Sequence, residues 1–277
     1  MKLWMEGAVA LFRSSLYKTV SAVVRTDDLV LVVDPTWLPH EVDAIREYAE
    51  SVRDGLPLYV LFTHSDYDHI LGYGAFPGAR TIASRAFADR SEEEREQTLE
   101  LIRAFDDDYY VERGYDMTYP EPDHAIAGEG EALRIGGTTL TFYQAPGHNP
   151  DGLFTVVEPL GLLLAGDYLS DVEFPFVYYS STLYEATIGK LDAILARHEI
   201  ALLVPGHGEE TPDAAEMKRR QAKDLAYLRA MREAVAARDQ ARIDALIDGC
   251  PFPRNLRKFH RNNQTLFERE HGTPPTT

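Results

Sequence analysis

Short apolar runs alternate with amphipathic stretches along most of the chain, and this alternation predicts interleaved strands and helices. Near the start, a polar turn at residues 26–28 separates two Val-rich runs, which predicts a strand pair over 20–25 and 29–33. Residues 40–53 place apolar side chains at helical spacing, and the continuous apolar run 58–62 predicts a buried strand.

The strand pattern returns after residue 131. We expect strands over 133–135, 138–143, 153–157, 162–165 and 200–204, helices over 184–197 and 212–237, and an interrupted helical tail over 240–270. Both halves of the chain place strands first and helices afterwards. This plan favours an α/β (α+β) protein in which two sheets pack face to face with helices outside.

Residues 85–124 depart from this plan. Ser91 followed by three glutamates is typical of a helix start, and an acidic, tyrosine-rich run follows at 106–110. We interpret 85–124 as an insertion that acts as a lid over a site at the flanking strand ends; a solvated acidic helix and loop is the alternative. We expect residues 212–277 to form a helical C-terminal extension of one domain spanning 1–277.

Composition narrows the classes of partner. The 277 residues carry a net charge of −17, which argues against binding nucleic-acid backbones. No apolar run is long enough to cross a membrane and no clear signal peptide is present, so no membrane partner is expected. The single cysteine excludes an internal disulfide and agrees with a reducing, cytoplasmic location. A small-molecule substrate remains open, even an anionic one, because metal ions can make a site locally positive.

Histidine and aspartate residues that could bind metal ions lie at the ends of predicted strands. The apolar run 58–62 leads directly into His64-Ser65-Asp66-Tyr67-Asp68-His69, and three later glycine-containing turns carry one further ligand-type residue each. Imidazole and carboxylate together suit zinc, iron and related ions, and two ions can activate a water and polarise a substrate oxygen. The seven candidate metal ligands are His64, Asp66, Asp68, His69, His148, Asp167 and His207.

This set resembles the metallo-β-lactamase-fold superfamily, whose usual signature is His-x-His-x-Asp-His followed by a distant His, an Asp or Cys, and a last His. The resemblance covers roughly residues 8–210. It implies an αββα sandwich with a site for two divalent metal ions at one edge of the sheets. It also implies a first metal held by His64, Asp66 and His148, a second held by Asp68, His69 and His207, and Asp167 shared between them.

One departure from the family pattern concerns Asp66, which stands where the signature has its second histidine. At that position only, the chain is similar to flavodiiron proteins, which carry a glutamate there and bind two irons. Three carboxylates and one hydroxide leave two divalent ions with a net charge of about zero. We therefore predict a less acidic bridging water than in the histidine version, and a greater tolerance for iron or manganese beside zinc.

The leading functional hypothesis is a dinuclear metal-dependent hydrolase in which a metal-bridging hydroxide attacks an ester, lactone or related small-molecule substrate. Asp68 is the candidate catalytic residue, as proton acceptor or orienter of the water. Possible hydrogen-bond donors to the substrate are Tyr67, Tyr168, Tyr178 and Tyr179, and the apolar run 174–179 could line a pocket. His124 and His260 could reach the site from the insertion and the tail.

The alternative is a diiron redox, oxygen-reactive or oxygen-sensing protein of the flavodiiron-like type without a flavin domain. Asp66 favours it, but the stretch after His207 is too short and too helical in pattern to supply the flavin domain of those proteins.

Overall fold

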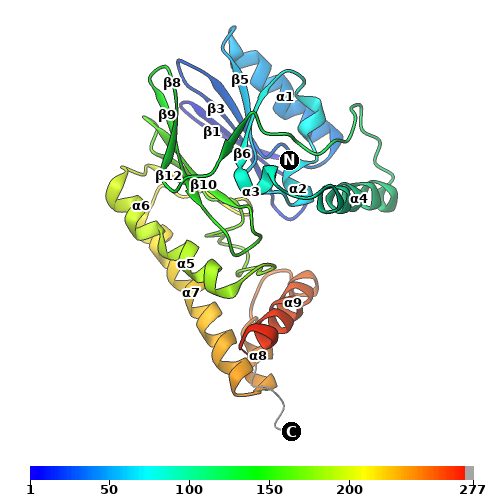
Figure 1. The fold of residues 1–277 in the computed structure, drawn as a ribbon, viewed down its shortest axis with the longest axis vertical. Coiled ribbons are helices and arrows are strands. Elements are labelled where there is room, and N and C mark those ends of the chain that lie inside the picture. The colour runs from blue at the N-terminus through cyan, green and yellow to red at the C-terminus, as the bar shows by residue number, and fades with distance from the viewer. Residues whose placement is uncertain (272–277) are drawn as a thin grey trace.

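Two β-sheets form the centre of the molecule (Figure 1). The computed structural model describes residues 1–271. The first sheet has the strand order β1-β2-β3-β4-β5-β6-β7, formed by Lys2–Glu6, Val9–Arg13, Val20–Arg25, Val30–Val33, Leu58–Leu61, Arg80–Ser84 and His124–Ile126. The second has the order β12-β11-β10-β9-β8, formed by Leu202–Val204, Leu162–Leu164, Leu153–Glu158, Thr138–Gln144 and Glu131–Ile135.

Helices cover the outer faces of both sheets. Those of the first half are α1 (Pro39–Arg53), α2 (Tyr67–Ile70), α3 (Arg85–Ala88) and α4 (Glu92–Tyr109), with a 3₁₀ turn over Tyr73–Ala75. Those of the second half are α5 (Ser181–Gly189), α6 (Leu191–Arg197), α7 (Ala214–Ala236), α8 (Gln240–Ala245) and α9 (Pro253–His271). This arrangement confirms the expected αββα sandwich, with the helical C-terminal segment at one end of the molecule (Figure 1).

Strand periodicity builds the core. In β4, Leu31 and Val33 belong to the apolar cluster between the two sheets, together with Leu140 and Phe142 of β9. The alternate residues of β4 point outward and pack under α1. Because successive side chains of a strand face opposite sides, a continuous Val/Leu run is the pattern that a sheet buried on both faces requires.

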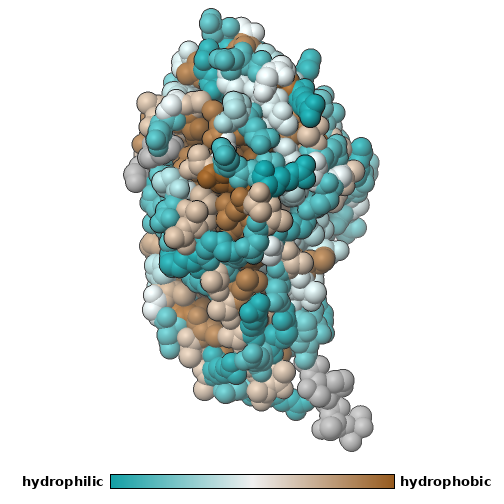
Figure 2. Space-filling view, turned by 90° about the vertical axis from the view of Figure 1, so that its left-hand side faces the viewer, coloured by the Kyte–Doolittle hydropathy of each residue, from teal (hydrophilic) through white to brown (hydrophobic). Residues whose placement is uncertain are grey.

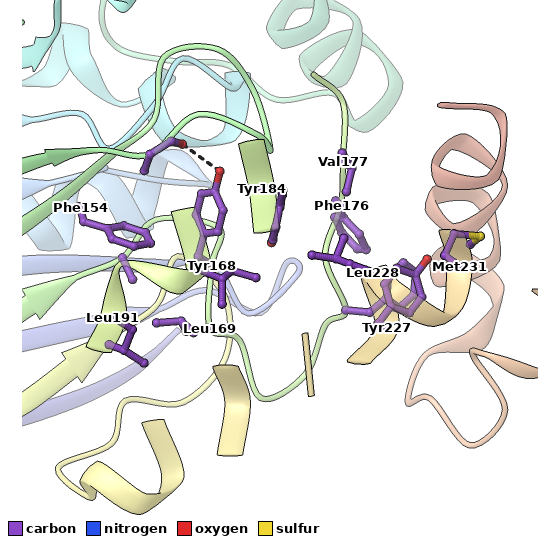
Figure 3. Close-up of a cluster of buried hydrophobic side chains, with 14 of the residues drawn as sticks. Phe154, Tyr168, Leu169, Phe176, Val177, Tyr184, Leu191, Tyr227, Leu228 and Met231 are labelled. Carbon is purple, nitrogen blue, oxygen red and sulfur yellow. Dashed lines mark hydrogen bonds between the residues drawn. The ribbon is translucent and has the colours of Figure 1, made fainter. Parts of the chain in front are cut away.

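The outer face of the second sheet carries a separate apolar cluster that joins it to the C-terminal helices (Figure 3). Phe154 of β10 contacts Tyr168 edge to face, and Tyr168 lies against Tyr184 of α5. Farther out, Leu228 and Met231 of α7 are fully buried in the same cluster. The extension after β12 is therefore part of this core.

Most predicted elements are present, with instructive differences. The helix start at Ser91 is confirmed, because the Ser91 hydroxyl caps the backbone N–H of Glu94. The single helix expected over 184–197 was wrong: Gly189 ends α5, α6 begins at Leu191, and Lys190 turns to donate a hydrogen bond to the carbonyl of Gln144. Strands β1, β2 and β7 were not anticipated.

The visible surface is mostly hydrophilic, in agreement with the charged residues in the composition. Hydrophilic residues cover most of the side shown in Figure 2, with hydrophobic residues grouped in patches between them. None of the helices within residues 1–271 is both long enough and apolar enough to cross a lipid bilayer.

Asp224 provides a test of the helical layer. It is 2% exposed on α7, and its Oδ1 has no hydrogen-bond partner among the described residues. Burial raises the pKa of this carboxyl to about 7. Since the folded-state pKa lies above the unfolded one, Asp224 lowers stability progressively as the pH rises from about 4 through 7.

We therefore expect the stability advantage of Asp224→Asn over the wild type to be larger at about pH 8 than at about pH 4.5, by about 1–3 kcal/mol. Urea unfolding at both pH values measures this gain, and the exposed Asp107→Asn should show none. A stability difference that does not change with pH would contradict the assignment.

Candidate metal centre

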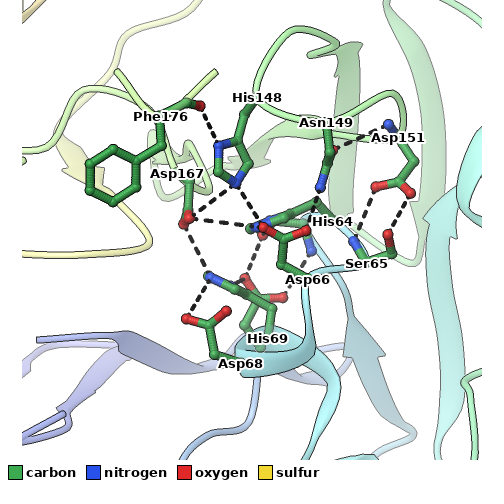
Figure 4. A network of polar contacts seen from close by, with 12 residues as sticks. His64, Ser65, Asp66, Asp68, His69, His148, Asn149, Asp151, Asp167 and Phe176 are labelled. Carbon is green, nitrogen blue, oxygen red and sulfur yellow. Dashed lines mark hydrogen bonds and ion pairs between the residues drawn. The ribbon is translucent and has the colours of Figure 1, made fainter. Parts of the chain in front are cut away.

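The candidate ligands meet at one edge of the two sheets, and Figure 4 shows six of the seven. His64 and Asp66 lie in the loop after β5, and Asp66 is the N-cap of α2. Asp68 and His69 are adjacent in the single turn of α2 and belong to the same ligand group. His148, Asp167 and His207 follow β9, β11 and β12, so the ends of the second sheet complete the cluster.

Distances divide the seven side chains into two groups. One ligand atom from each of His64, Asp66, His148 and Asp167 lies within 4.8 Å of the others, and the same holds for Asp68, His69 and His207. Each group could hold a metal ion.

Asp167 lies between the two groups. Its Oδ1 is 3.1 Å from His69 Nε2, and its Oδ2 is 3.4 Å from His148 Nε2 and 3.3 Å from His207 Nε2. A single carboxylate therefore faces histidines of both groups, which is the placement that a shared ligand needs.

All four imidazoles turn the same ring nitrogen toward the centre. Each turns its Nε2 toward the centre and its Nδ1 toward a protein group, so that rotation of the ring is restrained. The Nδ1 partners are Thr63 Oγ1 for His64 at 3.0 Å, Asp34 Oδ2 for His69 at 2.9 Å, the Phe176 carbonyl for His148 at 2.7 Å and the Tyr17 carbonyl for His207 at 3.0 Å.

Asp34 is a supporting residue that the sequence reasoning missed. Its Oδ1 accepts the backbone N–H of Thr63 at 2.8 Å, while its Oδ2 accepts the Thr63 hydroxyl and faces His69 Nδ1. A signal was available: Asp34 directly follows β4, which pairs in parallel with β5. Parallel neighbours end at the same sheet edge, so Asp34 had to lie beside the His64 loop.

Asp151 holds the opposite side of the same loop. Its carboxylate accepts the backbone N–H and the hydroxyl of Ser65, at 3.0 and 2.6 Å, and pairs with Arg90 at 3.1 Å. Arg90 belongs to the 85–124 segment, which therefore contacts the loop that carries His64 and Asp66. A lid function of 85–124 stays a prediction.

The electrostatics favour cations. Burial opposes protonation of His148, but the facing Asp66 carboxylate outweighs it and raises the pKa of His148 to about 9. Burial likewise opposes protonation of His207, whereas Asp167 and Glu173 raise its pKa to about 10. For Asp167, the penalty of burial is overcome by His207 and His69, which hold its pKa well below the usual range. A cluster that attracts protons this strongly also attracts metal ions.

Unsatisfied atoms show that the residues fit a metal. His64 Nε2, His69 Nε2 and Asp167 Oδ1 are buried and make no hydrogen bond of regular geometry among the described residues, although His69 Nε2 and Asp167 Oδ1 face each other at 3.1 Å. Buried polar atoms are rarely left so, and coordination of cations would satisfy all three at the centre of this His/Asp cluster.

Two glycines allow the close approach of these segments. A Cβ on Gly206 would collide with Asp167 Oδ1 and the Gly166 backbone, and a Cβ on Gly147 would collide with the backbone of Tyr184. Gly147 also has φ +136°, a conformation that side-chain-bearing residues avoid.

Of the four candidate tyrosines, one supports the His148 loop and one has its ring beside the His148 ring. Tyr168 is buried; its hydroxyl donates to the Ala145 carbonyl and accepts the His148 N–H, so it positions the His148 loop. The Tyr178 ring lies 4.9 Å from the His148 ring and is partly exposed beside the centre. Tyr179 is about half exposed, and the ring of Tyr67 packs edge-on against Trp37.

Two other expectations are not met at the centre, and a third is met only in part. His124 lies in β7 and its ring faces Tyr59, while His260 bonds to the Tyr227 hydroxyl and the Ile243 carbonyl within the helical layer. The apolar run 174–179 meets its expectation in part. Phe174 stacks on Tyr227 and Phe176 on Phe259, and both also line a small cavity with Asp167.

The fold and the His/Asp cluster together define a two-sheet protein with a candidate metal centre. The family model of the metallo-beta-lactamase superfamily matches residues 16–228. The chain therefore belongs to this superfamily. No curated protein matches the sequence.

Solved structures show the same fold. A metallo-beta-lactamase family protein from Thermus thermophilus is 23% identical with a TM-score of 0.65, covering 96% of this chain and 94% of that one. A beta-lactamase domain protein from Burkholderia ambifaria is 19% identical with a TM-score of 0.62, covering 96% and 86%. A stereoselective inverting sec-alkylsulfatase from Pseudomonas sp. is 14% identical with a TM-score of 0.69, covering 98% of this chain and 50% of that one.

Asp34→Asn tests the support of His69. Asparagine tolerates the left-handed backbone of Asp34, φ 45°, but offers one acceptor oxygen where Asp34 uses two. Either Thr63 or His69 then loses its partner, and we expect metal affinity to fall by about 10–100-fold. Competition with a chromogenic chelator measures this.

The matched control is Asp54→Asn, an exposed residue with φ 43° at the end of α1. Its metal affinity should equal that of the wild type. Equal affinity for Asp34→Asn would show that His69 needs no such support.

Proposed function

We propose that the protein is a dinuclear metal-dependent hydrolase acting on an ester, lactone or related small molecule. The observation that supports this most directly is the pair of ligand groups that share Asp167. In this proposal His64, Asp66 and His148 hold one ion, Asp68, His69 and His207 hold the other, and Asp167 contacts both. When bound, two such ions supply a water of lowered pKa and an electrophile for the substrate oxygen.

The residues of the chain supply orientation and a place for protons. Nδ1 contacts fix the imidazoles before substrate arrives, so little reorganisation is needed during the reaction. Asp68 keeps its role as candidate proton acceptor or orienter of the water. In the absence of metal, burial together with the charges of Asp167 and Asp66 raises the pKa of the Asp68 carboxyl, although His69 opposes this.

The comparisons support hydrolysis at the level of class. Members of this superfamily include many metallo-hydrolases, and one similar structure is named an alkylsulfatase. Because that protein is only 14% identical, it supports a shared fold and does not indicate which kind of bond this chain would cleave.

A second candidate function rests on Asp66, the carboxylate in place of the second motif histidine. Its Oδ2 lies 2.9 Å from His148 Nε2, and its Oδ1 accepts Asn149 Nδ2 at 3.2 Å. A first group of two carboxylates and two imidazoles is compatible with iron or manganese as well as zinc. A diiron redox or oxygen-reactive protein is therefore the alternative to hydrolysis.

Metal removal distinguishes these functions. Protein purified without added metal is analysed for zinc, iron and manganese, and then assayed for hydrolysis of ester, lactone and sulfate ester substrates and for oxygen consumption. We expect close to two ions per chain, hydrolysis that a chelator abolishes and metal restores, and no oxygen uptake. Chelator-sensitive oxygen uptake without hydrolysis would favour the diiron alternative, and failure to retain any metal would contradict both.

Asp167→Asn tests the shared ligand within the same assays. Loss of one carboxylate oxygen at the position between both groups should lower kcat/KM by at least about 100-fold and reduce the bound metal. Asp107→Asn, an exposed aspartate on α4, is the control and should retain full activity and metal content.

A further inference from the structure

The turn before β3 has an unusual backbone beside the metal centre. Tyr17 and Lys18 both have φ +52°, although neither is glycine. The turn is held in this conformation because His207 Nδ1 donates to the Tyr17 carbonyl and the Gly208 N–H donates to the Lys18 carbonyl, both at 3.0 Å. Such strained residues concentrate at binding and catalytic sites.

The side chains of this turn line a cavity of about 370 Å³. The other walls come from the loop after β11 and from the segment at the start of α9, which are distant in sequence. The main lining residues are Tyr17, Lys18, Val172, Glu173, Phe252 and Leu256. This volume is within the range of small-molecule pockets.

The cavity adjoins the metal centre through two of its walls. Tyr17 contacts His207 through its carbonyl. Glu173 also lines a small second cavity together with Asp167, the shared candidate ligand.

Half of the lining is aromatic or aliphatic, and the polar half contains one cation, Lys18, and one acid, Glu173. Lys18 Nζ lies 5.9 Å from the centroid of the Phe252 ring, and within residues 1–271 no carboxylate forms an ion pair with it. Because the chain has 45 acidic residues against 28 basic ones, acidic partners are plentiful, and an ammonium at the pocket without one stands out. One ammonium suits a singly charged carboxylate, whereas phosphate recognition usually employs arginine or several donors.

We propose that this cavity binds the part of the substrate that is not cleaved, and that the substrate is an amphipathic small molecule whose apolar body carries a free carboxylate recognised by Lys18. The inference rests on the proposed hydrolase function and adds a substrate class to it. The apolar body packs on Tyr17, Phe252 and Leu256, and the scissile group faces the metal centre.

Two esters that differ at one carbon test this proposal. Mono-4-nitrophenyl adipate and 4-nitrophenyl hexanoate share a six-carbon acyl chain that ends in a carboxylate or a methyl group. We expect the metal-loaded protein to prefer the adipate ester, chiefly through a lower KM. Lys18→Met should lower kcat/KM for that ester by about 10-fold and leave the hexanoate ester within about twofold, and Lys18→Arg should restore the preference.

Lys258→Met is the matched control. Lys258 is exposed on α9 and also lies 5.9 Å from an aromatic centroid, that of Phe259, but it does not line the cavity. Lys258→Met removes one positive charge and one cation–aromatic contact, as Lys18→Met does. It should leave the preference for the adipate ester intact. Methionine is unbranched like lysine, so Lys18→Met adds no backbone strain; circular dichroism verifies folding.

Calorimetric binding of adipate and hexanoate to the metal-loaded variants gives a readout that needs no turnover. Tighter binding of adipate that Lys18→Met removes supports the pocket even if neither ester is cleaved, and in that case only the hydrolase function fails. Hydrolysis of both esters without a Lys18-dependent preference overturns the pocket and leaves the hydrolase. If the protein shows no hydrolysis and no Lys18-dependent binding, both the pocket and the hydrolase function are overturned.

Discussion

Burial of four imidazoles and three carboxylates at one sheet edge is the constraint on which the structure depends. Charges removed from water are costly unless they are paired, and here the pairing runs through Asp167, which faces histidines of both ligand groups. The outward Nδ1 atoms are satisfied by Thr63, Asp34 and two backbone carbonyls, whereas inward atoms such as His64 Nε2 are not. The protein thus stabilises the outer half of the cluster and leaves the inner half suited to cations.

The fold serves this arrangement because it brings strand ends together. Parallel pairing of β4 with β5 places Asp34 beside the loop of His64, and β11 and β12 end at the opposite side of the centre. Glycines at 147 and 206 permit an approach that larger residues would block. Substrate recognition falls to segments outside this frame, namely the turn at Tyr17 and Lys18 and the start of α9. Family membership therefore explains the centre better than it explains the substrate.

Sequence reasoning recovered the sandwich and brought forward the seven side chains that the structure gathers, because strand periodicity and a dense His/Asp motif are local signals. It missed β1, whose residues 2–6 mix apolar and charged positions, and the break at Gly189 between α5 and α6. It also missed the supports of the imidazoles. Two of these are the carbonyls of Tyr17 and Phe176, and a carbonyl leaves no trace in the residue type. Placing Lys18 beside Phe252 required the tertiary structure, since 234 positions separate them.

Anomalous diffraction from crystals of the metal-loaded protein tests the central claim most directly. The account predicts two peaks, one contacted by His64, Asp66 and His148 and the other by Asp68, His69 and His207, with Asp167 touching both. A single peak, or ions bound elsewhere while these side chains keep their contacts with one another, would contradict it.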